Sequence, residues 1–581
     1  MTSYLDQINN PNDLKSLTLT ELKKLKKEVR KLVLNKVSKY GGHVGSNLGV
    51  VEMTIALHYV FNSPHDKIVF DVSHQTYPHK ILTGRKTGFL DNQFDTISGY
   101  SDPNESPHDH FIIGHTSTSI SLGLGLAKAR EVLKEEYNVI SIIGDGSLSG
   151  GVAFEGFDNA AVFEGNYIII INDNEMCIAE NHGGLYGNLN ELRRTKGRSK
   201  NNFFRNLGLD YRYLEKGHDI KKLIELFKEA KDIDHPIVLH IHTEKGHGYK
   251  YAVQDKERWH WAHPFNLETG EPIVKKLHDG DYIDIIHRTL DAFIENGSPI
   301  IAINAATPGV ARLKTFASKY PDRYIDAGIA EEFTITYAAG LAKGGVKPIV
   351  FHSSTFIQRA YDQLSHDLAL NNLPVVILVF GGSISSGSPT HIGDFDIPLI
   401  SNIPNIIYLA PASKEELRSM LCASLIQNEH PIVIRVPDGL PVSRKCEEFV
   451  FSEKPNWEVI SKGEKTAIIG LGEMLGYASE ISAYIKQQLG YESSVINPRY
   501  ITSINKDDLL NLARTHENII VLEAGCLSGG YGDKILRLLV NQNVKVYSYG
   551  SFREFHNGSK TELLKRFGMS KEQILKDIQD Y

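Results

Sequence analysis

The segment between residues 138 and 176 constrains the fold of this 581-residue chain more than any other part. Two apolar runs, Asn138–Ile143 and Tyr167–Ile171, have the length and unbroken hydrophobicity of strands that are buried on both faces of a sheet. A helical pattern separates them. A strand, a helix and a second strand in this order form a unit with parallel strands, so we expect an α/β fold.

Oxygen-bearing side chains follow both runs. Asp145 lies within Gly144-Asp145-Gly146, and Asn174 stands 29 residues further on, just after the second run. Carboxylate and amide oxygens suit Mg²⁺, which also takes ligands from phosphate, and glycines let backbone N–H groups approach a diphosphate. The first triplet alone fits a capped strand-to-helix turn equally well. With the second half at this spacing, the pattern favours Mg²⁺ and thiamine diphosphate.

Strand-like runs alternate with helical patterns along the whole chain, which is typical of α/β domains with mostly parallel sheets. We expect three domains, covering residues 1–275, 276–445 and 446–581. The further predicted strands are Ile237–His242, Pro299–Asn304, Pro348–Phe351, Leu373–Phe380, Ile406–Leu409, Ile432–Val436, Thr466–Gly470, Ser493–Asn497, Ile519–Glu523 and Val544–Tyr547.

Composition excludes several classes of function. The net charge of -7 argues against a nucleic-acid partner. No apolar run approaches the length of a membrane span, and the N-terminus lacks the basic-then-apolar pattern of a signal peptide. The four cysteines, Cys177, Cys422, Cys446 and Cys526, form no metal or disulfide pattern. We expect them to be buried thiols of a cytoplasmic protein.

Three local patterns need an interpretation. Leu22–Lys39 predicts an amphipathic helix with a solvated basic face, and Lys221–Lys231 is also helical. Glu180–Gly208 has little periodicity and follows the predicted metal ligands, so we expect an irregular active-site lid. Gly470-Leu-Gly472 is a plain strand–turn–helix, because the next glycine, Gly476, comes one residue late for a dinucleotide fingerprint.

Several longer motifs resemble the transketolase superfamily, and most of all the 1-deoxy-D-xylulose-5-phosphate synthase family. The similarity covers nearly the whole chain. The motifs are Gly41–Gly49, Asp71–Lys80, Gly114–Ile120, Lys245–Tyr249, Asp326–Glu331, Ser354–Asp362, Asn497–Arg499 and Phe552–Gly558.

The resemblance implies a transketolase-like fold in which a diphosphate- and metal-binding domain precedes a pyrimidine-binding domain. It implies a homodimer, supported mainly by the C-terminal domain, with thiamine diphosphate and Mg²⁺ held between the first two domains. It also implies the reaction. Pyruvate adds to the cofactor and loses CO₂, and the two-carbon unit passes to D-glyceraldehyde 3-phosphate.

The same resemblance assigns site residues. Glu331 stands where the family hydrogen-bonds the aminopyrimidine, and the imidazoles of His43, His74, His260 and His391 suit proton delivery and substrate contact near neutral pH. The metal ligands would be Asp145, Asn174 and the backbone carbonyl of Met176. The predicted cofactor-binding residues are His74, Gly114, His115, Thr116, Gly146, Ser147, Asn174, Tyr249, Glu331 and Phe356.

The acceptor site departs from the family pattern. Two arginines that bind the acceptor phosphate in the family are replaced, one by Phe380 or Gly381 and the other by Asp438. An acid of the family becomes Gly387 or Ser388, and a tyrosine becomes Ser353. Beside the catalytic glutamate, Glu332 and Phe333 also differ. Other basic residues, such as Arg359 or Arg499, could take over the phosphate.

These departures leave several functions open. The first is a pyruvate-dependent synthase of the family type. The second is a paralogue with a different acceptor, possibly lacking phosphate, and the third is a transketolase with a ketose donor. A catalytically silent thiamine diphosphate-binding protein is disfavoured, because Glu331, Asp145 and Asn174 are all present.

Overall fold

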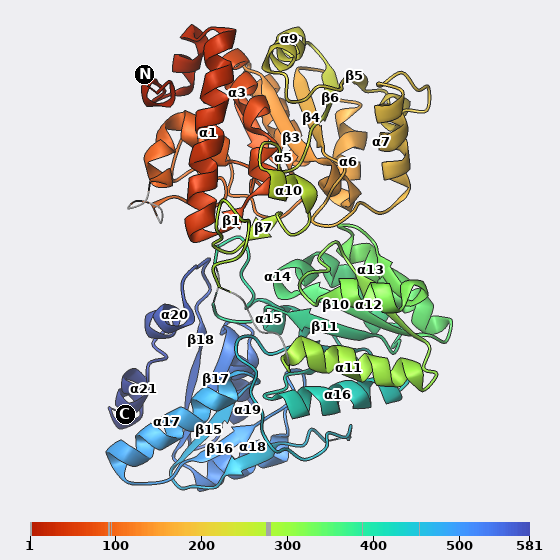
Figure 1. Ribbon diagram of the computed structural model, residues 1–581. Helices are drawn as coiled ribbons and strands as arrows, with labels where there is room; N and C mark the ends of the chain where they lie inside the picture. Colours follow the sequence, from red (N-terminus) through yellow and green to blue (C-terminus); the bar gives the residue numbers. More distant parts are fainter. Residues whose placement is uncertain are drawn as a thin grey trace. The chain divides into compact units, whose positions relative to one another are not determined.

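The computed structural model describes residues 3–90, 93, 96–274, 280–385, 387–452 and 454–580 (Figure 1). The chain divides into two compact units. The first contains residues 1–276 and 328–330, and the second contains 277–327 and 331–581. The predicted boundary at 275/276 lies outside the described residues. The boundary at 445/446 falls inside the second unit, so the division into three domains stays a prediction.

The first unit is built on a five-stranded parallel sheet in the order β2-β3-β4-β6-β5. Its strands are β2 (Lys67–Phe70), β3 (Val139–Gly144), β4 (Tyr167–Asp173), β5 (Asp210–Leu214) and β6 (Pro236–His242). Its helices are α1 (Leu19–Tyr40), α2 (Gly45–Leu48), α3 (Val51–Val60), α4 (Tyr77–Lys80), α5 (Ser119–Leu133), α6 (Gly151–Ala160), α7 (Gly184–Arg194), α8 (Phe203–Asn206), α9 (Ile220–Ala230) and α10 (Lys250–Gln254).

Helices cover both faces of this sheet, which explains the unbroken hydrophobicity of its strands. On β4, Ile168 and Ile170 pack with α1, α3 and α9. Ile169 and Ile171 point to the other face, where they pack with α5, α6 and α7. A separate antiparallel pair, β1 (Gly42–His43) and β7 (Trp261–Ala262), joins two distant segments of the same unit.

The second unit holds two sheets. The first is parallel, in the order β12-β13-β11-β10-β8-β9, and the second has the order β14-β16-β15-β17-β18, with only β14 antiparallel. The strands are β8 (Ile300–Asn304), β9 (Tyr324–Asp326), β10 (Lys347–Ser353), β11 (Val376–Phe380), β12 (Ile407–Leu409), β13 (Ile432–Arg435), β14 (Glu458–Ser461), β15 (Thr466–Gly470), β16 (Ser494–Asn497), β17 (Asn518–Cys526) and β18 (Lys545–Ser551).

One continuous apolar cluster joins these two sheets. Ile377 and Val379 of β11 belong to the same core as Ile469 of β15 and Val521 of β17. The helices of this unit are α11 (Tyr282–Glu295), α12 (Leu313–Lys319), α13 (Glu331–Lys343), α14 (Ser354–Ile357), α15 (Asp396–Ile400), α16 (Lys414–Ile426), α17 (Met474–Leu489), α18 (Lys506–Thr515), α19 (Tyr531–Leu539), α20 (Lys560–Arg566) and α21 (Lys571–Gln579).

The predicted α/β architecture with mostly parallel sheets is confirmed, and each predicted strand is present. The ends differ in places, since β11 begins at Val376 and β18 extends to Ser551. The sequence patterns did not predict the two-residue strands β1 and β7, or the strands β2, β5, β9 and β14, which lie at the edges of their sheets. Gly470 ends β15 and Met474 begins α17, as the strand–turn–helix interpretation requires.

Two predictions are wrong. Glu180–Gly208 is not an irregular stretch, because α7 and α8 occupy much of it and bury Leu189, Leu192 and Phe204. Leu185, Leu189 and Leu192 repeat at helical spacing, but the intervening polar residues concealed this signal. Among the cysteines only Cys526 is buried, and the other three are partly exposed. In the described part of the chain, no helix is both long and apolar enough to cross a membrane.

Candidate active site

Asp145 and Asn174 lie together at the carboxyl end of the first sheet. β3 and β4 are parallel neighbours, with Gly144 opposite Asn172. Asp145 directly follows β3, and Asn174 directly follows β4. The backbone N–H of Asn174 donates to Oδ1 of Asp145 at 3.4 Å. The sheet register therefore brings together the two residues that the sequence pairs.

The donor set fits a divalent cation. Asp145 is buried, and this burial, together with the charge of Asp173, raises the pKa of its carboxyl group to about 8. Its Oδ2 accepts a hydrogen bond from Nδ2 of Asn181 at 2.7 Å. Oδ1 of Asn174 is buried and has no hydrogen-bond partner among the described residues. A buried carboxylate beside an unsatisfied amide oxygen is what a hard cation would satisfy.

Asp173 supports this edge and was not predicted. Its carboxylate is bonded to Nε2 of His240 at 2.7 Å and to Nη1 of Arg193 at 2.6 Å. Although burial opposes it, these two partners hold the pKa of Asp173 at about 2. Arg193 lies on α7, so this helix braces the strand end. Met176 follows the turn and forms a single bridge with Glu180.

A buried carboxylate holds the backbone directly after the segment Gly114–Thr116. Oδ1 of Asp71 accepts the backbone N–H of Ser117 at 2.8 Å, and Oδ2 accepts that of Ser119 at 3.0 Å. Ser117 in turn donates from Oγ to the carbonyl of Ser147 at 2.8 Å. The two predicted cofactor segments, at Gly114–Thr116 and at Ser147, are therefore tied together in one unit.

Three residues beside these segments have a strained backbone. Val72, Ser73 and Ser117 adopt φ values of 58°, 63° and 76°, which L-residues rarely do. Each costs about 1–3 kcal/mol and persists only where surrounding contacts enforce it. Gly146 is needed for a different reason, since a Cβ there would lie 2.7 Å from Cα of Cys177.

Three predicted histidines form a cluster of rings in the first unit. The ring centroid of His43 lies 4.9 Å from that of His74 and 5.5 Å from that of His260. The centroids of His74 and His260 are 5.2 Å apart. The β1–β7 ladder pairs His43 with Trp261, which places His260 beside it. Burial first, and then the charges of Lys245 and the other histidines, lower the pKa of His260 well below its usual value. His260 is therefore neutral near pH 7.

Asn47 connects the backbones of two of these histidines. Its Nδ2 donates to the carbonyl oxygens of His43 and His74, both at 2.8 Å. Its Oδ1 accepts the backbone N–H of Tyr77 at 2.8 Å. Asn47 is completely buried, so these contacts are not shared with solvent.

Tyr249 is mostly buried in the core of the first unit. Its hydroxyl donates to the carbonyl of Leu267 at 3.1 Å, and its ring lies edge-on to Trp259 at 5.2 Å. These contacts fix the side chain, and its predicted contact with the cofactor stays a prediction.

The second unit contains the remaining predicted residues. Glu331 begins α13 and is buried, which raises the pKa of its carboxyl group. Nη1 of Arg359 lies 3.3 Å from its Oε2. Phe356 and His391 meet edge-to-face with ring centroids 5.7 Å apart. Burial lowers the pKa of His391 to about 4, and its Nδ1 is bonded to Oγ1 of Thr390 at 2.8 Å.

Three of the positions that depart from the family pattern lie at the carboxyl ends of neighbouring strands in one sheet. Ser353 ends β10 and Phe380 ends β11, and these residues are opposite each other in parallel strands. β13, the other neighbour of β11, ends three residues before Asp438. The carboxyl ends of parallel strands are where ligands bind in such folds.

Glu473, which the sequence analysis did not single out, accepts hydrogen bonds from two residues that follow β11 and β13. Its Oε1 accepts from Oγ of Ser383 at 3.1 Å, and its Oε2 accepts the N–H of Asp438 at 3.3 Å. Nζ of Lys560 lies 3.2 Å from Oε1, and the Glu473 side chain is only 6% exposed. Nothing in the local sequence marks Glu473, because its partners come from distant segments.

The arginines near this edge are already engaged. Arg435 is bonded to Asp396 at 2.8 Å and 3.1 Å and to the carbonyls of Gly393 and Ala524. Arg499 is buried and ion-paired with Glu416 at 2.7 Å. The expectation that Arg499 could replace a phosphate-binding arginine is therefore wrong, and Arg359 is paired with Glu331.

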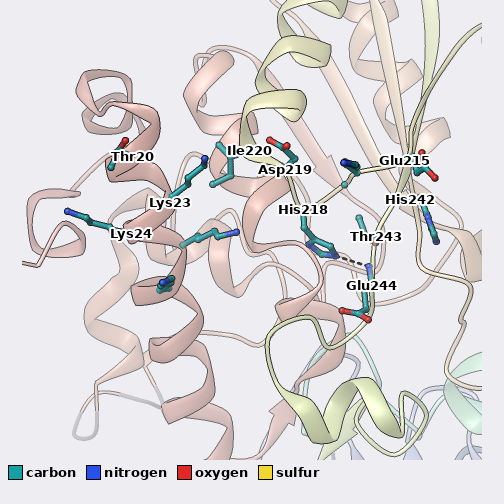
Figure 2. Close-up of a pocket in the computed structure, with 14 residues that line it drawn as sticks. Thr20, Lys23, Lys24, Glu215, His218, Asp219, Ile220, His242, Thr243 and Glu244 are labelled. Atoms are coloured by element: carbon teal, nitrogen blue, oxygen red, sulfur yellow. Dashed lines mark hydrogen bonds between the residues drawn. The ribbon is translucent and has the colours of Figure 1, made fainter.

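A cavity of the first unit lies apart from these residues (Figure 2). It has a volume of about 790 Å³ and is lined by α1, the β5–α9 connection and the segment after β6. None of the predicted site residues lines it. In Figure 2, Lys23 extends toward Ile220, whereas Lys24 points away. The basic face of α1 is solvent-exposed, as predicted.

Beneath this cavity, Glu52, His218 and His247 have ligand-type atoms within 4.8 Å of one another. These atoms are already used. Glu52 is ion-paired with Arg30 at 2.8 Å and Lys26 at 3.1 Å. Nε2 of His218 accepts the N–H of Glu244 at 2.8 Å, so its Nδ1 carries the proton and donates to Glu52. The group is an ion-pair cluster that does not fit a cation.

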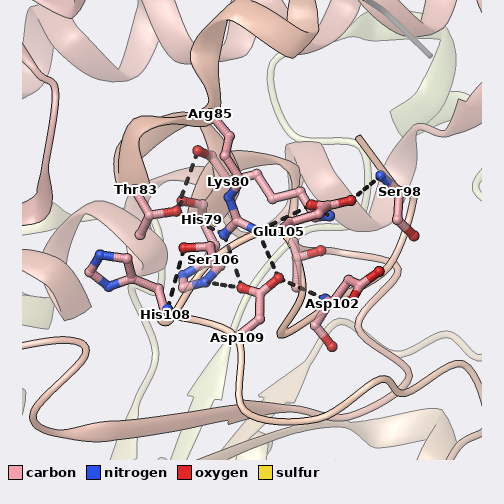
Figure 3. A network of polar contacts seen from close by, with 12 residues as sticks. His79, Lys80, Thr83, Arg85, Ser98, Asp102, Glu105, Ser106, His108 and Asp109 are labelled. Atoms are coloured by element: carbon pink, nitrogen blue, oxygen red, sulfur yellow. Dashed lines mark hydrogen bonds and ion pairs between the residues drawn. The ribbon is translucent and has the colours of Figure 1, made fainter. Parts of the chain in front are cut away.

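A buried network supports the motif that carries His74 (Figure 3). Asp109 accepts from Nε2 of His79 at 2.9 Å and from Arg85 at 2.7 Å and 2.9 Å. Although burial opposes it, these bonds hold the pKa of Asp109 well below its usual range. Nδ1 of His79 is in turn bonded to Nε2 of His58 at 2.9 Å. The network holds α4, which begins three residues beyond His74, against α3.

Three family models match successive parts of the chain. Residues 5–201 and 193–243 match 1-deoxy-D-xylulose-5-phosphate synthase. Residues 279–441 match the pyrimidine-binding domain of transketolase, and residues 456–574 match the transketolase C-terminal domain.

Similar proteins cover the full length. The 1-deoxy-D-xylulose-5-phosphate synthase of Symbiobacterium thermophilum is 37% identical over 98% of this chain and 94% of its own. That of Clostridium acetobutylicum is 38% identical over 100% of this chain and 99% of its own. Among solved structures, the transketolase of Campylobacter jejuni is 16% identical, covers 97% of this chain and 100% of its own, and superimposes with a TM-score of 0.44.

Proposed function

Because this chain belongs to the 1-deoxy-D-xylulose-5-phosphate synthase family of thiamine diphosphate-dependent transferases, we propose that it decarboxylates pyruvate and transfers the two-carbon unit to an aldehyde. The observation that carries this proposal is the pair at the β3 and β4 ends. The buried Asp145 carboxylate lies beside the Asn174 amide oxygen, which has no hydrogen-bond partner among the described residues. D-glyceraldehyde 3-phosphate is the family's acceptor.

Asp145, Asn174 and the carbonyl of Met176 would hold Mg²⁺. Gly146, Ser147 and the segment Gly114–Thr116 would bind the diphosphate, and the ties through Asp71 and Ser117 support their placement. Thiamine diphosphate, when bound, would supply an acidic thiazolium carbon and a sink for the electrons released with CO₂.

Glu331 would hold a proton at its carboxyl group and share it with the pyrimidine ring nitrogen. Burial raises the pKa of this group and favours the protonated form, while Arg359 opposes the shift. Neutral His260 would accept a proton, and His43 and His74 would exchange protons with substrate oxygens. Phe356 would stack on the pyrimidine, and His391 would contact a substrate.

The direct test uses the purified chain with Mg²⁺, thiamine diphosphate, pyruvate labelled at its carboxyl carbon, and D-glyceraldehyde 3-phosphate. We expect labelled CO₂ and a 1-deoxyketose product in equal amounts. Release of no CO₂ from pyruvate, in the presence or absence of an aldehyde, would overturn the proposed donor.

We expect Asn47→Asp to lower kcat by about 10- to 100-fold, because displacing a catalytic group by an ångström has effects of that size. The change keeps the side-chain volume and the acceptor for Tyr77. It replaces the N–H donors to the carbonyls of His43 and His74 with an oxygen that repels them. Steady-state kinetics measure kcat, and calorimetry should give an unchanged affinity for Mg²⁺ and cofactor.

The matched control is Asn138→Asp, at the opposite end of β3. Nδ2 of Asn138 donates to Asp66 at 3.1 Å and to Asp232 at 2.8 Å, so the same substitution destabilises the same unit. It should lower the melting temperature without changing kcat. Equal kcat values for the two variants would contradict a role for Asn47 in placing the histidines.

A second candidate differs only in the acceptor. The edge formed by β10, β11 and β13 carries Glu473 and Asp438, while Arg435 is fully engaged with Asp396, Gly393 and Ala524. Carboxylates repel a phosphate, but they can accept hydrogen bonds from the hydroxyls of an uncharged polyhydroxy aldehyde. This arrangement supports a paralogue whose acceptor lacks phosphate.

Glu473→Gln should distinguish these candidates. A unit charge about 7 Å from a phosphate at an effective dielectric near 20 contributes about 2 kcal/mol before screening. If the charge selects the acceptor, kcat/KM for D-glyceraldehyde 3-phosphate should rise roughly tenfold, and that for unphosphorylated glyceraldehyde should not. The control is Glu480→Gln on the same helix, where the glutamate is 59% exposed. Wild-type preference for the phosphorylated aldehyde, unchanged in Glu473→Gln, would reject the second candidate.

We also propose that the protein is a cytoplasmic homodimer and that it requires Mg²⁺. These parts of the proposal rest on the family resemblance and on the sequence.

A further inference from the structure

A loop that carries His391 joins β11 to α15. We call residues 381–385 and 387–395 the His391 loop. One end of it lies at the carboxyl edge of the parallel sheet, and His391 meets the ring of Phe356 on α14. A chain of hydrogen bonds leads from Ser388 through Thr390 to Nδ1 of His391, each at 2.8 Å. The orientation of the imidazole therefore depends on the path of this loop.

The loop is held by residues of the C-terminal sheet region. Nε2 of His556 donates to the carbonyl of Ile384 at 3.0 Å. At the neighbouring position, Oγ of Ser383 donates to Glu473 at 3.1 Å. His556 and Ile384 are almost completely buried, so water does not compete for this bond.

The far end of the loop has a second anchor from the same region. The backbone N–H of Cys526 donates to the carbonyl of Asp394 at 2.9 Å, and Oγ of Ser551 is bonded to the Asp394 carboxylate. Nε2 of His556 lies 3.7 Å from the same carboxylate. His556 is thus adjacent to both anchors, and His391 lies between them in the sequence.

The bond to Ile384 requires a proton on Nε2 of His556, because a carbonyl can only accept. Nδ1 of His556 faces a second carbonyl, that of Glu554, at 3.3 Å. Alanine at this position would leave a buried carbonyl without a donor and would release one anchor of the loop. Glutamine would restore an N–H donor near the position of Nε2.

We propose that His556 is a positioning residue, which holds the His391 loop so that His391 meets the substrate. The C-terminal region then serves the reaction through this loop, in addition to its packing role. This inference rests on the proposed function, because it assigns His391 to substrate contact. It requires no contact between His556 and any substrate.

The experiment compares His556→Ala, His556→Gln and the control His516→Ala in the full chain. His516 lies in the same region, where its Nε2 is bonded to Ser494 at 2.9 Å, and it has no described contact with the loop. We expect His556→Ala to lower kcat/KM by about 10- to 100-fold, as misplacement of a substrate-contacting group does. His556→Gln should recover most of this loss, and His516→Ala should leave kcat/KM unchanged.

Two further readouts separate positioning from general damage. Hydrogen exchange should be faster in peptides covering 381–395 of His556→Ala, and should be slowed again in His556→Gln. The affinity for Mg²⁺ and thiamine diphosphate, measured by calorimetry, should not change. Equal losses in the alanine and glutamine variants, or unchanged exchange in this loop, would overturn the proposal.

Failure of the proposed function would look different. In that case the wild-type chain would release no CO₂ from pyruvate, while the exchange pattern of the loop would still depend on His556. Wild-type turnover in all three variants, with faster exchange in His556→Ala, would instead reject the positioning role of His556 alone.

Discussion

Glu331→Ala is expected to reduce turnover by about 10²- to 10⁴-fold, the range that a positioned acid or base contributes. The Glu331 side chain is buried at the start of α13, where burial raises the pKa of its carboxyl group and Arg359 lies 3.3 Å from it. Alanine removes the only group that we assign to the pyrimidine nitrogen. The exchange of the thiazolium proton into deuterated water should slow together with CO₂ release.

The control for this variant is Glu332→Ala. Glu332 is the next residue of the same helix turn and is partly exposed. Its charge adds less than burial does to the raised pKa of Glu331, so its loss should change exchange and turnover far less than Glu331→Ala does. Both variants should retain the far-ultraviolet circular dichroism spectrum of the wild type. Wild-type turnover and exchange in Glu331→Ala would contradict the assignment of Glu331 to the pyrimidine nitrogen.

Asp145→Asn is expected to weaken binding of Mg²⁺ and thiamine diphosphate by more than about 100-fold. Loss of outer partners of metal sites typically lowers metal affinity by about 10- to 100-fold, and a direct ligand should matter more. The substitution keeps the side-chain shape but removes a carboxyl group whose charged form is disfavoured by burial and by Asp173. The melting temperature without cofactor should therefore stay the same or rise, which rules out unfolding as the cause of weak binding.

Two further variants provide comparisons for the loss of affinity in Asp145→Asn. Asn181→Ala removes the amide that donates to Asp145 at 2.7 Å, and it should lower affinity by about 10- to 100-fold. Asp158→Asn makes the same charge change at an exposed position of α6 and should have no effect. Calorimetric titration of each variant gives the affinities. Equal affinity in Asp145→Asn and the wild type would remove Asp145 from the metal site.

Local patterns predicted most of the architecture, because each buried strand must be apolar on both faces. The run at Tyr167–Ile171 is a clear case, since alternate isoleucines of β4 pack against different helices. Asp145 and Asn174 could be paired from the sequence for a related reason. Parallel neighbouring strands place their carboxyl ends at one edge, so two strand-end residues come together whatever the rest of the chain does.

Helix α7 could not be recognised in the same way. Its apolar residues Leu185, Leu189 and Leu192 are separated by glycine and asparagine, which have low helix propensity. Packing against the sheet supplies the stabilisation that the local sequence lacks, and the ion pair of Arg193 with Asp173 adds to it. A segment that reads as a loop is therefore part of the support of the site.

The sequence by itself determined the α/β architecture and the membership of the family, because both depend on local hydrophobic periods and on contiguous motifs. The same motifs predicted which residues would serve the cofactor. Only the tertiary structure decided how the acceptor edge is arranged. It committed Arg435 and Arg499 to buried carboxylates, and it brought Glu473 and His556 to the His391 loop. These are contacts between segments roughly 40 to 170 residues apart, and no local pattern encodes them.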